Sequence, residues 1–361
     1  MDLRALLDEM HHREAIDLHL AAGTPPVYRV NGQLAVFLEE DYRNAGLQRV
    51  LTASDLADIT AQLDSMTLGF APDPMKWGLE EPSRHRNARA ILLRLGENAY
   101  RISVGSASGG PVIAVRMIPT HVPRLCELLE GDGVIAGLSK LHHGLVIIAG
   151  QTGSGKATTL ASMVQEINSS RNTRICVVGI EYLMHSARSL LTQHIEGWDC
   201  EDTADGIAQA AGLDPDIIAV MELADEPSVL AALRLAERQR LVLATIHAGT
   251  VSRAVERLYQ LTHNHMPLVR SQLAENLQAV IAQRLVPRAG EEGSVAIHEV
   301  LLGTARTAQA IAAGGTDLAP IIADGKEDGM RTFDDSLLRL LARDVISMAT
   351  ARENVDDPSR L

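Results

Sequence analysis

The chain has 361 residues, of which 46% are hydrophobic and 22% charged, and it carries a formal net charge of −13. This length and composition are typical of a soluble protein with two domains, and the negative charge argues against nucleic acid or an anionic membrane as a direct partner. No run of 18 apolar residues predicts a membrane span, the start shows no signal peptide, and three widely spaced cysteines indicate a reducing compartment, so we expect a cytoplasmic protein.

Residues 1–118 have the pattern of an α+β domain with an antiparallel sheet. A short helix is expected over 2–13, and Ser54 is expected to cap a second helix. The dipeptide Asn31-Gly32 between two alternating segments predicts a hairpin turn. The predicted strands of this domain lie at 16–20, 27–30, 33–36, 90–95, 100–104 and 112–118.

A linker is expected over 119–135, and from residue 136 to the end of the chain strands alternate with helices. The strands are short, apolar and rich in Val and Ile, which predicts a buried parallel sheet in an α/β domain. The C-terminal part, from about Thr304, is predicted to be helical. The predicted strands of this domain lie at 145–149, 173–178, 217–221 and 241–246, with a fifth candidate at 294–301.

The segment Gly150-Gln151-Thr152-Gly153-Ser154-Gly155-Lys156 has the pattern of a phosphate-binding loop. It lies between the predicted strand at 145–149 and a predicted helix, as such a loop requires. Glycines let backbone N–H groups surround phosphate oxygens, the helix N-terminus adds its dipole, and Lys156 supplies a positive charge. The residues assigned to nucleotide binding are Gly150, Thr152, Gly153, Ser154, Gly155, Lys156, Ala157 and Thr158.

The position after the lysine departs from the usual pattern. It holds Ala157, where a Ser or Thr hydroxyl normally holds Mg²⁺. Thr158 is not an obvious substitute, because one residue along a helix turns a side chain by about 100°. We therefore assign no direct protein ligand to the metal, and no structural metal site is expected from the histidine pairs, which lack further ligands at useful spacing.

Two polar residues follow predicted strands at the edge where parallel sheets place their ligands. Glu222 follows the strand at 217–221, and we interpret it as a carboxylate that holds Mg²⁺ through water or polarises the attacking water. The alternative is that Glu222 only begins the next helix. His247 follows the strand at 241–246, and two interpretations stay open, a γ-phosphate sensor or a satisfied core histidine.

Taken in order, segments along nearly the whole chain resemble the PilT-like ATPases that retract type IV pili, within the secretion-type motor ATPases. The phosphate loop resembles their Walker A segment and the strand before Glu222 their Walker B segment. The resembling segments are 17–26, 29–32, 116–119, 150–159, 214–225, 245–248 (similar to a histidine box), 279–285 and 330–338.

The resemblance implies a fold and a set of partners. It implies a PAS-like domain over 1–118 and a RecA-like P-loop ATPase domain with C-terminal helices over 136–361, assembled into a hexameric ring that binds ATP and Mg²⁺. It implies a motor at the inner face of the membrane, held there by an inner-membrane pilus platform protein, that disassembles pilin and drives twitching motility. Arg101 and Arg116 stand where arginines of such N-terminal domains reach the phosphates.

The chain departs from this family at catalytic positions. The family's acidic box, Glu-Asp-Pro-Ile-Glu, corresponds to Val177-Val178-Gly179-Ile180-Glu181, so Glu181 is kept and Val177 replaces the candidate general base. Met221 stands where the Walker B glycine is expected. Three hypotheses stay open: a working motor in which Glu222 takes over water activation, a degenerate paralogue that serves as a regulatory or structural subunit of a pure or mixed ring, and an assembly ATPase of a related secretion or conjugation system.

Overall fold

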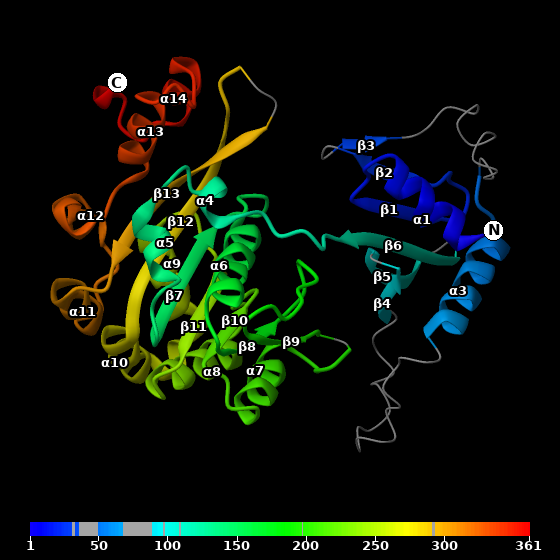
Figure 1. The fold of residues 1–361 in the computed structure, drawn as a ribbon, viewed down its shortest axis with the longest axis horizontal. Coiled ribbons are helices and arrows are strands. Elements are labelled where there is room, and N and C mark those ends of the chain that lie inside the picture. Colours follow the sequence, from blue (N-terminus) through cyan, green and yellow to red (C-terminus); the bar gives the residue numbers. More distant parts are fainter. Residues whose placement is uncertain are drawn as a thin grey trace. The chain divides into compact units, whose positions relative to one another are not determined.

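The computed structural model describes residues 1–30, 33–35, 50–67, 89–96, 98–107, 110–196, 198–290 and 293–361. The chain divides into two compact units (Figure 1). One comprises Met1–His121 with Gly197–Glu201, and the other comprises Val122–Glu196 with Asp202–Leu361. The division falls inside the segment expected to be a linker, while the domain bounds 1–118, 119–135 and 136–361 stay predictions.

The N-terminal unit contains a six-stranded antiparallel sheet in the order β3-β2-β1-β6-β5-β4. Helices α1 (Leu3–His12) and α3 (Ala53–Thr67) pack their apolar side chains against one face of it. The predicted Asn31-Gly32 turn and Val36 lie outside the described residues. The strands are β1 (Asp17–Ala21), β2 (Val27–Val30), β3 (Gln33–Ala35), β4 (Arg89–Leu95), β5 (Asn98–Ala107) and β6 (Gly110–Ile118).

The two faces of this sheet differ in character because side chains alternate along a strand. On β1, Leu18 and Leu20 are buried against the helices, whereas Asp17 and His19 lie on the other face. The same alternation on β5 and β6 places arginines on the face opposite the helices. The N-terminal sheet is therefore apolar on one side and polar on the other.

The second unit contains a seven-stranded sheet in the order β13-β12-β7-β11-β10-β8-β9. All neighbours pair in parallel except β12 and β13, which pair antiparallel at one edge. The strands are β7 (Gly144–Gly150), β8 (Arg174–Val178), β9 (Leu190–His194), β10 (Ile217–Val220), β11 (Leu241–His247), β12 (Leu277–Pro287) and β13 (Ser294–Leu302). Strands β9 and β12 were not predicted from the sequence, and β13 is antiparallel rather than a fifth parallel strand.

Helices cover both faces of this sheet, as expected for strands whose residues are buried throughout. One face packs against α4 (Leu125–Leu128), α5 (Gly133–Leu138) and α6 (Lys156–Ser170). The other face carries α7 (Thr203–Gly212), α8 (Glu226–Glu237), α9 (Val251–Leu261), α10 (Met266–Asn276), α11 (Ala305–Ala312), α12 (Ala319–Asp324), α13 (Phe333–Leu341) and α14 (Met348–Asn354).

The structure also bears on membrane insertion. Within the described part of the chain, no helix combines the length and the apolar character that a membrane crossing requires.

Candidate nucleotide-binding site

The phosphate-binding loop leaves the centre of the second sheet. It follows β7, whose seven residues are all buried, and α6 begins at Lys156. Gly153 and Gly155 have φ angles of 80° and 82°, a left-handed conformation that favours glycine. The Lys156 Nζ donates a hydrogen bond to the Gln151 carbonyl oxygen at 3.1 Å, so its amine is held at the loop. The sheet thus presents a formed strand–loop–helix unit.

Glu222 and Glu181 lie close enough to Lys156 for their charges to act on it. Burial lowers the pKa of Lys156, and the negative charges of Glu222 and Glu181 oppose that shift. Glu222 is exposed and lies in the loop after β10, whereas α8 begins only at Glu226. Glu222 therefore does not begin the helix, and the structure brings one lysine and two carboxylates to this edge of the sheet.

His247 is the last residue of β11 and pairs in register with Gly150, where the phosphate loop begins. Its side chain is exposed, whereas the preceding Ile246 is buried. The interpretation of His247 as a core histidine is therefore wrong, and its role as a phosphate sensor stays a prediction.

Val177 and Val178, which replace part of the family's acidic box, belong to the core, and Thr158 has a partner of its own. The Thr158 hydroxyl lies within hydrogen-bond distance of the Tyr182 hydroxyl, at 3.1 Å. Val177 is fully buried among the apolar side chains between the sheet and α6, and Val178 is buried on the opposite face. A carboxylate at position 177 would have to displace part of this core.

Gly179 and Met221 both depart from the family motifs, and the two residues pack against each other. Gly179 follows β8 with a φ angle of 103°, and a Cβ atom at this position would lie 2.7 Å from the Cβ of Met221. No side chain larger than hydrogen fits beside Met221 in this arrangement. Met221 itself is buried, so the two changes together close the ends of β8 and β10 with apolar contacts.

The two arginines expected at the phosphates lie in the N-terminal unit. Arg101 on β5 and Arg116 on β6 pair in register, and both are exposed. The Arg116 Nε donates to the buried Asp17 carboxylate at 2.8 Å, and the Arg29 Nε donates to the other oxygen of Asp17 at 3.2 Å. Arg116 is therefore held by an ion pair within its own unit, and the role of both arginines in binding phosphate stays a prediction.

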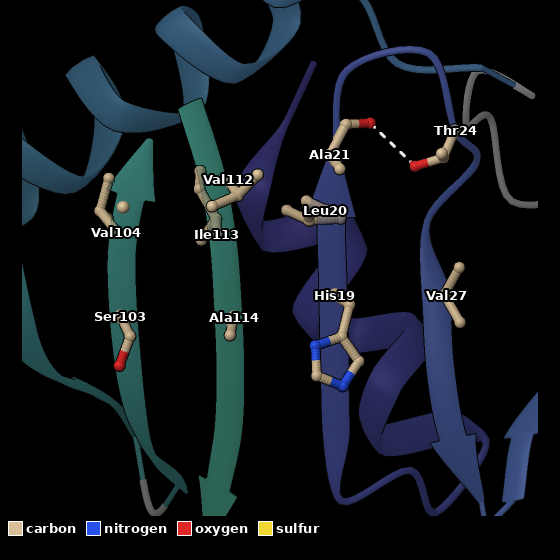
Figure 2. A pocket seen from close by; sticks show the side chains of 11 residues that line it. His19, Leu20, Ala21, Thr24, Val27, Ser103, Val104, Val112, Ile113 and Ala114 are labelled. Carbon is tan, nitrogen blue, oxygen red and sulfur yellow. Dashed lines mark hydrogen bonds between the residues drawn. The ribbon is translucent and has the colours of Figure 1, made fainter. Parts of the chain in front are cut away.

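The same polar face carries a cavity of about 380 Å³. Figure 2 shows His19 from β1 with Ser103 and Ala114 from the neighbouring strands β5 and β6. Among the described residues that line it, His19 is the single titratable side chain. The described lining contains no lysine, arginine or carboxylate.

The described part of the chain offers few protein ligands for Mg²⁺. Within the described ranges, no cluster of three His, Cys, Asp or Glu side chains could hold a metal ion. Mg²⁺ at a nucleotide keeps several waters and takes its other ligands from phosphates and one or two carboxylates. Glu222 fits the part of such a carboxylate, whereas Ala157 supplies no hydroxyl.

The replacement Ala157→Ser tests the missing hydroxyl. It places an oxygen in the first turn of α6, where the usual loop has its metal ligand, and position 157 is only half-buried. We expect Mg²⁺ to strengthen ADP binding about tenfold more in this variant than in the unmodified protein, as one added ligand of roughly 1.4 kcal/mol would do. Calorimetric titration with and without Mg²⁺ measures this difference.

Thr158→Val is the matched control. The Thr158 hydroxyl is bonded to Tyr182, so its removal should leave the effect of Mg²⁺ on ADP binding unchanged. Loss of the Mg²⁺ effect in Thr158→Val would show that Thr158 holds the ion after all.

Gln283, which lies against the phosphate loop, was not predicted from the sequence as a site residue. It pairs in register with Gly150 from β12, and 2% of it is exposed. Its side chain contacts Ser154, Thr159 and His298. The available signal was a single amide directly after the apolar run 279–282.

His298 next to Gln283 predicts a pH dependence of stability. Burial, helped by the positive charge of Arg339, lowers the pKa of His298 to about 3 from 6.5. The unfolded chain therefore binds a proton below about pH 6.5 that the folded chain does not, and the contribution of His298 to stability falls as the pH falls from 6.5 towards 3. We expect this residue alone to lower the unfolding free energy by about 2 kcal/mol between pH 7 and pH 5.

Urea unfolding at pH 7 and pH 5 measures this loss. His298→Gln keeps an amide donor for Gln283 and has no titrating group, so the loss on acidification should be smaller by that amount in the variant. An equal loss in both proteins would show that His298 is accessible to protons in the folded state.

Comparisons with known proteins identify the family of this chain. The family model of the "Type II/IV secretion system protein" matches residues 130–321. The "Type IV pilus retractation ATPase PilT" of Pseudomonas aeruginosa is 30% identical over 366 residues, covering 99% of each chain. The "Uncharacterized protein YggR" of Escherichia coli K12 is 38% identical over 262 residues, 69% of this chain and 80% of the relative.

A solved structure is similar over the full length. The crystal structure of the "Pilus Retraction Motor PilT and Bound ADP" has a TM-score of 0.80 and 27% identity, and the match covers 100% of this chain and 99% of that one. Its likeness includes the N-terminal antiparallel sheet and the mostly parallel second sheet. The chain therefore belongs to the type II/IV secretion system protein family, and it is a P-loop NTPase of the secretion ATPases.

Proposed function

We propose that the protein is an ATP-driven motor subunit of the pilus-retraction class, which works in a hexameric ring at the inner face of the membrane. The observation that carries the proposal is the set of one lysine and two carboxylates at the phosphate loop, Lys156 with Glu222 and Glu181. The full-length likeness to a pilus retraction motor supports the same class. A platform protein of the pilus in the inner membrane is the proposed partner.

The proposed chemistry assigns each group one task. Backbone N–H groups of the loop and the Lys156 amine bind the phosphates, and Glu222 orients and polarises the attacking water. Mg²⁺, when bound with ATP, neutralises charge on the phosphates. Arg101 and Arg116 would approach the same phosphates from the N-terminal domain, and His247 at the loop would sense the γ-phosphate.

A second candidate function rests on a separate observation. Val177 is fully buried where the family has a candidate general base, and Ala157 lacks the metal hydroxyl. A positioned base is worth about 10² to 10⁴ in rate, so hydrolysis without it would be slow. In that case the chain would act as a nucleotide-binding regulatory or structural subunit of a ring, alone or mixed with an active relative.

Deletion of the gene in its host tests the cellular role. If the protein is a retraction motor, its deletion should leave more pili on the cell surface and abolish twitching. Expression of the Lys156→Ala chain in the deletion strain should restore neither the normal number of pili nor twitching. Loss of surface pili on deletion would contradict retraction and indicate a motor of extension. Unchanged pili and motility would contradict both and favour a secretion or conjugation system.

A further inference from the structure

The Gln283 side chain joins the phosphate loop to two other elements. Its Nε2 donates to the Ser154 carbonyl oxygen at 2.7 Å. Its Oε1 accepts from the Thr159 hydroxyl on α6 at 2.8 Å and lies 3.2 Å from the His298 Nε2 on β13. Because an amide oxygen only accepts, His298 carries its proton on Nε2. One buried amide thus ties the loop, the helix and the edge strand together.

The bond to Ser154 fixes the direction of a neighbouring N–H group. In a planar trans peptide the carbonyl oxygen and the following N–H point in opposite directions. The Ser154 carbonyl points towards β12, so the N–H of Gly155 points away from it. Gln283 fills the β12 side, which leaves the other side of the loop for a phosphate. The hydrogen bond therefore turns the Gly155 N–H to the side from which a phosphate can approach.

Two glycines of the loop make room for Gln283. A Cβ atom at Gly155 would lie 2.8 Å from the Gln283 Nε2, and a Cβ atom at Gly150 would lie 2.9 Å from its carbonyl oxygen. A side chain at Gly150 would force the β12 backbone to shift, and one at Gly155 would displace the Gln283 amide from its hydrogen bonds. Gly150 and Gly155 are therefore favoured by their packing against β12, whereas Gly153 faces open space.

His298, the partner of Gln283 on β13, is also held in place by hydrogen bonds. The Ser336 hydroxyl of α13 donates to the His298 carbonyl oxygen at 2.8 Å and accepts from the His298 N–H at 3.2 Å. His298 is fully buried, so it keeps its position against Gln283. The buried His298 therefore holds the Gln283 side chain in position before a ligand binds at the loop.

We propose that Gln283 is a positioning residue of the nucleotide site, which orients the Ser154–Gly155 peptide so that the Gly155 N–H is ready to bind a phosphate of ADP or ATP. The proposal rests on the proposed nucleotide site at Lys156. Because the loop peptide is already oriented in the free protein, nucleotide binding does not lose free energy to ordering it. Gln283 acts through the loop backbone rather than by touching the nucleotide.

Replacement of Gln283 by leucine in the full chain tests this role. Gln283→Leu keeps the approximate volume and removes every hydrogen bond of the amide, and we expect ADP affinity to fall at least tenfold in a calorimetric titration. The matched control is Gln272→Leu on α10, because Gln272 is equally buried and its side-chain oxygen has no partner among the described residues. The control should bind ADP within about twofold of the unmodified protein.

Gln283→Glu is a second variant that tests the same role if Gln283→Leu does not fold. It retains an oxygen acceptor for Thr159 and His298, and its carboxyl can donate to Ser154 only while protonated. ADP affinity of this variant should fall as the pH rises from 6 to 9, relative to the unmodified protein. A purely structural role would give no such pH profile.

The outcomes separate this proposal from the one on which it rests. Unchanged ADP affinity in Lys156→Ala would overturn the site itself. Loss of affinity in Lys156→Ala together with control-like binding in both Gln283 variants would overturn the role of Gln283 alone.

Discussion

Glu222→Gln should lower Mg-ATP turnover by about 100-fold or more, because a positioned acid–base group contributes about 10² to 10⁴ in rate. The amide has nearly the shape of the carboxylate, but it carries no negative charge and cannot act as a general base. Glu222 is exposed beyond β10, so the replacement leaves the core of the sheet untouched. ADP affinity should stay within a few-fold, since Glu181 still faces Lys156. Steady-state phosphate release and a binding titration measure the two effects.

Two further variants make this experiment selective. Glu237→Gln, an exposed glutamate at the end of α8, should leave turnover unchanged. Glu181→Gln removes the other carboxylate that acts on Lys156. If Glu181→Gln abolished turnover and Glu222→Gln did not, the assignment of the principal catalytic carboxylate would be wrong.

Lys156→Ala should weaken ADP and ATP binding by about 100-fold. Removal of a charged partner from a hydrogen-bonded ion pair at a binding site costs about 2 to 5 kcal/mol, and each 1.4 kcal/mol is a factor of ten. The Lys156 amine is already held at the loop by the Gln151 carbonyl, so the unmodified protein loses little freedom when a phosphate binds. Fluorescence titration with a labelled ADP measures the loss.

Lys140→Ala is the matched control for the lysine. Lys140 is exposed and lies before β7, at the end of that strand opposite the phosphate loop. Its removal should leave nucleotide affinity unchanged. Equal affinities in all three proteins would place the nucleotide away from the phosphate loop.

The centre of the second sheet and its polar edge were predictable from sequence. Short apolar runs predicted β7, β8, β10 and β11, and because parallel strands end at one edge, Lys156, Glu222 and His247 were expected to gather there. The resemblance supplied the family. Each of these inferences needs only a local pattern and one rule of sheet geometry.

The contacts that sequence reasoning missed depend on pairing between distant segments. Gln283 follows Gly150 by more than a hundred residues, and only the register of β12 on β7 brings them together. Asp17 meets Arg116 because β1 pairs with β6. No local pattern encodes these pairings, since the order of strands in a sheet is set by the packing of the whole domain.

The same limit applies to substitutions that compensate one another. From sequence, Gly179 and Met221 are two separate departures from the family motifs. In the structure a Cβ atom at Gly179 would lie 2.7 Å from that of Met221, so each residue accounts for the other. The changes at β8 and β10 therefore form one rearranged, apolar end of the sheet beside Glu181 and Glu222.

The measurement that tests the central claim most directly is steady-state phosphate release by the purified full chain with Mg-ATP, with Lys156→Ala as the blank. The mass of the assembly is recorded on the same sample. We predict turnover above the blank in a hexameric protein. Turnover equal to the blank in a hexamer would contradict a working motor and indicate a regulatory or structural ring subunit.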